Sequence, residues 1–137
     1  MSPDEACKKL VGQWLKKADE DYIVLERLFK DEEPILIPIA FHAQQAVEKY
    51  LKAYLTSKHI DFPKTHDIQE IRNLIASVNP GISEELKDCD LLTPYGVEIR
   101  YPSDFPDVTF EEAKQAVELV RRTRQAILDA LKISQDK

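Results

Sequence analysis

Helical spacing is most regular in residues 41–53, which read Phe41-His42-Ala43-Gln44-Gln45-Ala46-Val47-Glu48-Lys49-Tyr50-Leu51-Lys52-Ala53. In and around this stretch, mainly apolar side chains recur every three or four positions on one side of a helix: Ala40, Ala43, Val47, Leu51, Tyr54 and Leu55. The pattern predicts an amphipathic helix over about Ile35 to Lys58. Pro38 is compatible with this helix because a proline is tolerated in the first turns.

The chain before this stretch predicts one long helix. Ser2-Pro3-Asp4-Glu5 combines an N-cap serine, a first-turn proline and a glutamate three residues after the cap, which together satisfy free backbone donors. Apolar residues then follow at three- and four-residue spacing: Val11, Trp14, Leu15, Ala18, Tyr22, Leu25, Leu28 and Phe29. We expect this helix to end before Asp31-Glu32-Glu33-Pro34.

Three further helices and one loop are predicted after the central stretch. Asp67 with Glu70 caps a third helix, which Asn79-Pro80-Gly81 ends. Ser83, with two glutamates in the first turn, begins a fourth helix that extends to about Leu92.

The loop is expected over residues 93–107, where three prolines and one glycine interrupt any periodic pattern. This loop also holds Tyr95, Arg100, Tyr101 and Phe105. Thr109 with Glu112 forms another capping box, and the fifth helix then runs almost to the end, leaving residues 134–137 as a frayed tail.

The composition agrees with a helical fold. The 137 residues are 43% hydrophobic and 32% charged with three glycines, a mixture rich in helix formers. We therefore predict an all-α protein, a five-helix antiparallel up-and-down bundle that forms a single domain over residues 1–137. No apolar run approaches the roughly 20 residues that cross a bilayer, and Cys7 and Cys89 are expected as reduced thiols, so we expect a soluble cytoplasmic protein.

The charge limits the partners of the chain. A formal net charge of −6 repels a phosphate backbone, so any nucleotide or RNA requires a local basic site. His42, His59 and His66 lack the spacing of zinc ligands, and no Gly-rich phosphate loop is present. We expect neither a metal nor a cofactor, and we assign no catalytic residue.

Two groups of residues are candidates for ligand binding. His42, Gln45, Lys49 and Lys52 are spaced by three, four and three residues, so they share one stripe of the central helix; the alternative is an ordinary solvated face. In the late loop, Arg100 offers a planar fork for phosphate, and Tyr95 and Tyr101 offer faces for stacking or for plain packing.

Two further features have simpler interpretations. His66 precedes the third helix, where its side chain is expected to bond a backbone carbonyl and pin the loop. Arg121, Arg122 and Arg124 form the densest basic cluster, which we interpret as a solvated face or a dimer contact.

Three stretches together resemble the HEPN family, the nucleotide-binding domain of higher eukaryotes and prokaryotes. They are residues 41–53, Lys64-Thr65-His66-Asp67-Ile68, and Arg100-Tyr101-Pro102. The resemblance implies a five-helix bundle that forms a homodimer and acts beside a small nucleotidyltransferase in a toxin–antitoxin or related two-component system. Many members are also metal-independent ribonucleases with an Arg followed, after four to six residues, by a His. Here the corresponding positions hold Phe105, Pro106 and Asp107.

The resemblance and the residues together favour a nucleotide-binding or partner-binding module. In this hypothesis Arg100 and Lys49 contact phosphates, Tyr101 stacks on a base or braces the loop, and His42, Gln45 and His66 shape the pocket, with Lys52 on the same stripe. A ribonuclease and a pure protein-interaction surface remain alternatives. The hypothesis requires that the stripe of the central helix and Arg100 face one shared cleft.

Overall fold

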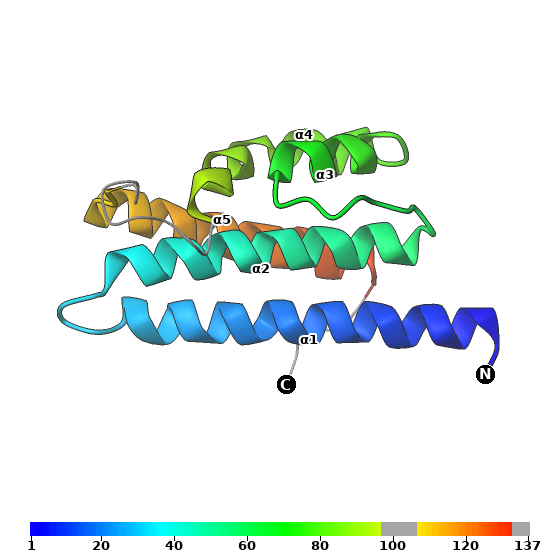
Figure 1. The fold of residues 1–137 in the computed structure, drawn as a ribbon, viewed down its shortest axis with the longest axis horizontal. Coiled ribbons are helices and arrows are strands. Elements are labelled where there is room, and N and C mark those ends of the chain that lie inside the picture. The colour runs from blue at the N-terminus through cyan, green and yellow to red at the C-terminus, as the bar shows by residue number, and fades with distance from the viewer. Residues whose placement is uncertain (97–106, 133–137) are drawn as a thin grey trace.

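The computed structural model describes residues 1–96 and 107–132, and within these ranges the chain is all-α. Its elements are α1 (Pro3–Phe29), α2 (Leu36–Ser57), α3 (Ile68–Ala76), α4 (Pro80–Glu85), the 3-10 helix η1 (Lys87–Gly96) and α5 (Phe110–Ala130), as Figure 1 shows. The predicted all-α bundle is therefore confirmed. Among the described residues, none of the helices combines the length and apolar content needed to cross a membrane.

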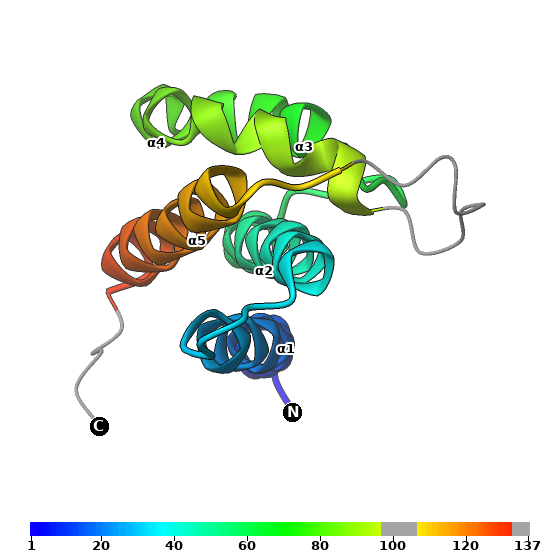
Figure 2. The same ribbon diagram turned by 90° about the vertical axis from the view of Figure 1, so that its left-hand side faces the viewer.

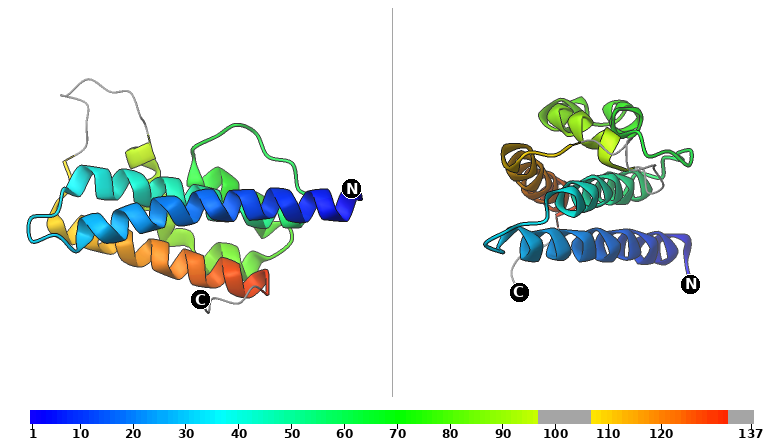
Figure 3. Two further views of the ribbon diagram at one scale, coloured as in Figure 1. Left: turned by 90° about the horizontal axis from the view of Figure 1, so that it is seen from below. Right: turned by 60° about the vertical axis from the view of Figure 1, so that its left-hand side comes forward.

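α2 lies at the centre of the molecule, with α1 on one side and the layer of α3, α4 and η1 on the other (Figure 2). α5 runs beside α2, and the view from below in Figure 3 shows α1 lying across both α2 and α5. Fourteen of the 22 residues of α2 are buried, because neighbouring elements cover most of its circumference. Polar residues on this helix therefore lie in the interior rather than on a free surface.

The helix ends confirm most of the expected caps. Glu5 N donates to Ser2 Oγ at 3.1 Å, and Glu112 N donates to Thr109 Oγ1 at the same distance, so both capping boxes form. Asp67 caps α3 by accepting from Gln69 N at 3.0 Å.

The predicted fourth helix is wrong in its start and its form. α4 begins at Pro80, because Asn79 Oδ1 accepts from Ile82 N at 3.1 Å and a proline suits the first helical position. Ser83 is buried and bonds Arg72 instead of capping a helix. The chain then continues as η1 to Gly96, so part of the predicted loop is helical.

α1 is attached to the bundle by polar contacts as well as by apolar packing. It buries only Ala18, Asp21 and Leu25. Asp19 accepts from Arg124 Nε at 3.1 Å and from the buried Tyr50 hydroxyl, whose pKa is raised by burial and by this carboxylate.

The basic cluster of α5 takes part in this attachment. Arg121 holds Glu26 through two bonds of 2.6 and 3.0 Å. The interpretation as a solvated face is wrong for Arg124, which is 20% exposed and binds Asp19 of α1. Arg121 is exposed, as expected for a solvated face, and it also binds Glu26 of α1. The alternative of a dimer contact stays a prediction. Arg122 is as exposed as Arg121, and Asp88 lies 4.0 Å from it.

We predict that acid weakens this attachment. Hydrogen bonds from Arg121 lower the pKa of Glu26, so its contribution to stability is present above the unfolded pKa of about 4.5 and is lost as the pH falls through the lower folded value. Glu26→Gln should lower the free energy of unfolding at neutral pH by about 0.5–1 kcal/mol and should flatten its decline in acid. Urea unfolding between neutral pH and pH 3 measures both effects. Glu118→Gln, at an exposed position on α5, is the control, and an identical acid profile for Glu26→Gln and the parent would contradict the assignment.

Candidate functional site

The four stripe residues lie together with two neighbours on what we call the polar face of α2. It consists of His42, Gln44, Gln45, Glu48, Lys49 and Lys52. At 100° per residue, positions 42 and 49 border α1, positions 44 and 48 border the α2–α3 connection (residues 58–67), and positions 45 and 52 lie between them. Gln45 and Lys52 are only 9% and 7% exposed, so the alternative of a solvated face is wrong for them.

The side of the polar face next to α1 is organised by Asp21. Its Oδ1 lies 2.9 Å from His42 Nδ1, and its Oδ2 accepts from Lys49 Nζ at 2.6 Å. Burial alone would raise the pKa of the Asp21 carboxyl, but the bonds from His42 and Lys49 outweigh burial and hold the pKa below its usual value. Lys49 is therefore already committed to a carboxylate.

The other side is organised by Glu48, whose side chain is 5% exposed. Oε1 accepts from Gln44 Nε2 at 3.1 Å and lies 2.8 Å from His66 Nδ1, while Oε2 accepts from Lys52 Nζ at 2.8 Å. Burial alone would raise the pKa of Glu48. The hydrogen bonds from its donors, of which Lys52 has the largest effect, outweigh burial and lower the pKa. The carboxylate is thus buried, charged and fully bonded.

The same donors fasten the α2–α3 connection to α2. Lys52 Nζ donates to the Thr65 carbonyl at 3.3 Å, and Gln44 Nε2 donates to the His66 carbonyl at 3.0 Å. Gln45 Nε2 in turn donates to Gln44 Oε1 at 2.7 Å, which fixes the Gln44 amide. Lys52 and Gln44 therefore hold the connection directly, and Gln45 supports Gln44.

His66 is the one member of this network that faces solvent. Its side chain is 71% exposed while Nδ1 points to the buried Glu48. The prediction that this side chain bonds a backbone carbonyl is wrong, because it bonds a carboxylate and its own carbonyl is the acceptor. A neutral imidazole that donates Nδ1–H to Glu48 has Nε2 free as an outward-facing acceptor or base.

The end of η1 rests directly on the polar face. Gly96 is buried, and a Cβ at this position would lie 2.6 Å from Gln44 Oε1 and 2.8 Å from Nε2. Thr93 Oγ1 also accepts from Ile68 N at 3.1 Å, which joins η1 to the start of α3. Arg100 and Tyr101 lie outside the described residues, so their position relative to the polar face stays a prediction.

Three organising residues were not predicted from the sequence. Gln44 and Glu48 stand in the central stretch, but glutamine and glutamate are common helix formers and gave no separate signal. Asp21 did give a sequence signal, because it lies three residues after Ala18 and four before Leu25. This spacing is that of the buried apolar residues, so an acidic side chain stands at a core position.

The described residues hold no group of three or more His, Cys, Asp or Glu side chains suited to a metal. Cys7 and Cys89 are free thiols. Burial raises the pKa of Cys89 to about 11, so this thiol is not a nucleophile near neutral pH.

We predict that Gly96→Ala disrupts the polar face. The added methyl group must displace the buried Gln44 amide, so the substitution should cost about 1–3 kcal/mol of unfolding free energy. In a Gln44→Ala background the same change should cost clearly less, because the obstacle is gone. Chemical denaturation of the four proteins measures the coupling.

The matched control is Gly12→Ala on α1, where nothing lies within 4 Å of the added Cβ. This change should stabilise the protein by about 0.5–1 kcal/mol, as expected for glycine to alanine in a helix. Equal costs of Gly96→Ala with and without Gln44 would contradict the contact.

Comparison with known proteins identifies the family. A sequence profile described as the HEPN domain matches residues 11–131, a range that includes all of α2 and the α2–α3 connection. No curated protein and no solved structure matches the chain. Since the matched range covers most of the 137 residues, the chain belongs to the HEPN domain family.

Proposed function

We propose that this HEPN protein binds a nucleotide or an RNA phosphate group at the polar face and acts beside a small nucleotidyltransferase in a two-component system. The observation that carries the proposal is the exposed His66 imidazole held by the buried, fully bonded Glu48 carboxylate. A buried ionic network that presents one titratable group to solvent is typical of functional sites.

The ion pairs of the site suggest which residues would bind a phosphate. Lys49 and Lys52 are neutralised by Asp21 and Glu48, so neither is a free cation. We therefore propose that Arg100 and His66 bind the phosphate. Lys49 could contact the phosphate only if its ion pair with Asp21 were broken. His42 and Gln45 shape the surface between these groups, and Tyr101 stacks on the ligand or braces the loop.

The covalent chain supports a contact between Arg100 and the polar face. Gly96 packs on Gln44, and four residues span at most about 14 Å in an extended chain. A long arginine side chain adds further reach. The length of the chain is thus compatible with the shared cleft that the proposal requires.

Family membership supports the partners. HEPN proteins commonly dimerise and are encoded beside small nucleotidyltransferases, so we propose a homodimer and such a partner for this chain. Ile35, Ile37 and Phe110 are 59%, 44% and 48% exposed, and Phe110 stacks on Phe29 at the end of α1. These apolar side chains supply contact surface for a protein partner.

A metal-independent ribonuclease is the second candidate function. It is favoured by the His66–Glu48 pair, because a carboxylate on Nδ1 leaves Nε2 as a general base and Arg100 would stabilise the charged phosphorane. His66 would replace the family histidine that residues 105–107 lack. RNA cleavage in EDTA by the parent but not by His66→Ala would support this function, and an inert parent would remove it.

We predict that Arg100→Ala and His66→Ala each weaken nucleotide binding at least tenfold, the effect of losing one charge-assisted hydrogen bond. Isothermal titration calorimetry with a panel of nucleoside monophosphates measures the affinities, and circular dichroism checks the fold. Arg122→Ala, which removes an exposed arginine of α5, is the control and should bind as the parent does. A parent that binds no nucleotide, or variants with unchanged affinity, would contradict the proposal.

A further inference from the structure

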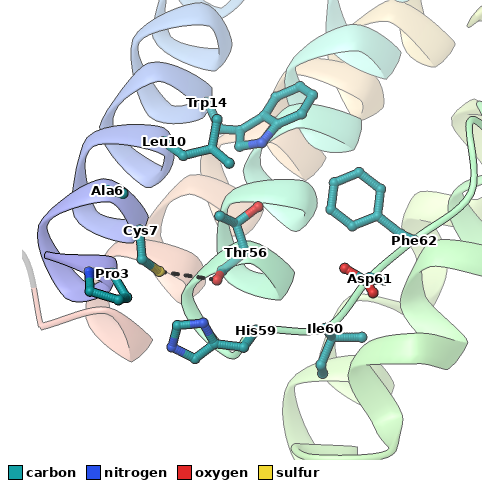
Figure 4. A pocket seen from close by; sticks show the side chains of 10 residues that line it. All are labelled: Pro3, Ala6, Cys7, Leu10, Trp14, Thr56, His59, Ile60, Asp61 and Phe62. Atoms are coloured by element: carbon teal, nitrogen blue, oxygen red, sulfur yellow. Dashed lines mark hydrogen bonds between the residues drawn. The ribbon is translucent and has the colours of Figure 1, made fainter. Parts of the chain in front are cut away.

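A cleft of roughly 650 Å³ lies beside the polar face, where α1 begins and α2 ends (Figure 4). One wall comes from α1 and the other from the α2–α3 connection, with Thr56 of α2 between them. The side chains of the walls are Ala6, Cys7, Leu10 and Trp14 on one side and Ile60, Asp61 and Phe62 on the other. The volume is in the range of sites that bind small molecules.

The cleft lies next to one end of the polar face. Thr56 lies four residues after Lys52, one turn further along the same stripe of α2. The rings of Trp14 and Phe62 meet edge to face with centroids 6.1 Å apart. The Lys52 ammonium lies 5.6 Å from each centroid, so this lysine links the aromatic pair to Glu48. The aromatic pair of the cleft therefore lies next to the polar face.

Several polar groups of the cleft have no partner within the described residues. The indole nitrogen of Trp14, which faces into the cleft in Figure 4, makes no hydrogen bond there. Neither the imidazole of His59 nor the carboxylate of Asp61 is bonded to another described residue, and both residues are exposed. Cys7 differs, because its Sγ donates to the Thr56 carbonyl at 3.4 Å. The cleft thus combines apolar walls with one free donor, one free acceptor and an imidazole.

His59 carries a backbone cost that its own contacts do not explain. Its φ is 58°, in the left-handed region, where glycine is the usual residue after a helix. A side chain other than glycine costs of order 1–2 kcal/mol in this conformation. The imidazole bonds no described residue and lines the cleft, so it is available to a ligand.

We propose that this cleft binds the base of the nucleotide, and that guanine is the preferred base. The inference rests on the proposed function, since the phosphate of the same ligand lies on the polar face. Trp14 and Phe62 supply ring surfaces for the base. The Asp61 carboxylate accepts from the N1–H and the amino group of guanine, which donate side by side. Pyrimidines and adenine do not offer this pair of donors.

Trp14 provides a local reporter, because it is the only tryptophan in the chain. The parent protein is titrated with GMP, CMP and ribose 5-phosphate while tryptophan emission and binding heat are recorded. We expect GMP to quench the emission and to bind at least tenfold more tightly than ribose 5-phosphate, which should bind without quenching. CMP should bind between the two.

The variant that tests base recognition is Asp61→Asn, at an exposed position outside the polar face. It should reduce GMP affinity at least fivefold and leave the affinity for ribose 5-phosphate unchanged, whereas the control Glu118→Gln should bind GMP as the parent does. Binding heat with GMP but constant Trp14 emission, or equal affinity of Asp61→Asn and the parent for GMP, would overturn the cleft assignment and leave the proposed function standing. No binding heat with any of the three probes would overturn both.

Discussion

The buried carboxylate of Glu48 is the constraint on which the arrangement of the site depends. It lies on the most enclosed helix of the bundle, where an unpaired charge would be too costly to retain. Lys52 and Gln44 of α2 and His66 of the α2–α3 connection meet this requirement together. Because one of the three donors comes from the connection, satisfying Glu48 also determines where His66 stands.

The same network reaches the elements on both sides of α2. Lys52 holds the Thr65 carbonyl on one side and lies beside the ring of Trp14 from α1 on the other. Gln44 supports the end of η1, which leads toward Arg100 in the chain. These contacts therefore join α2 to the connection, to the wall of the cleft and to the end of η1. Polar contacts of this kind are coupled rather than additive.

The long helices were predictable because their signals are local. Spacing of apolar residues and the capping boxes at Ser2 and Thr109 located α1 and α5, and the stripe of α2 followed from spacing alone. The start of α4 was not predictable, because Asn79-Pro80 follows the end of α3 and also begins α4. The same residues are a signal for the end of a helix and for the start of one. The burial of Gln45 and Lys52 and the pairing of Arg121 with Glu26 depend on neighbours distant in sequence. No pattern within one helix reveals such neighbours.

The tautomer of His66 shows whether Glu48 orients this imidazole. Free neutral histidine prefers the proton on Nε2, whereas a bond to Glu48 requires it on Nδ1. Nitrogen-15 NMR of the imidazole above its titration range distinguishes the two forms. We expect the Nδ1–H form to dominate in the parent and the Nε2–H form to return in Glu48→Gln. A parent with the proton on Nε2 would show that Glu48 does not orient His66, and the site described above would lose its organising contact.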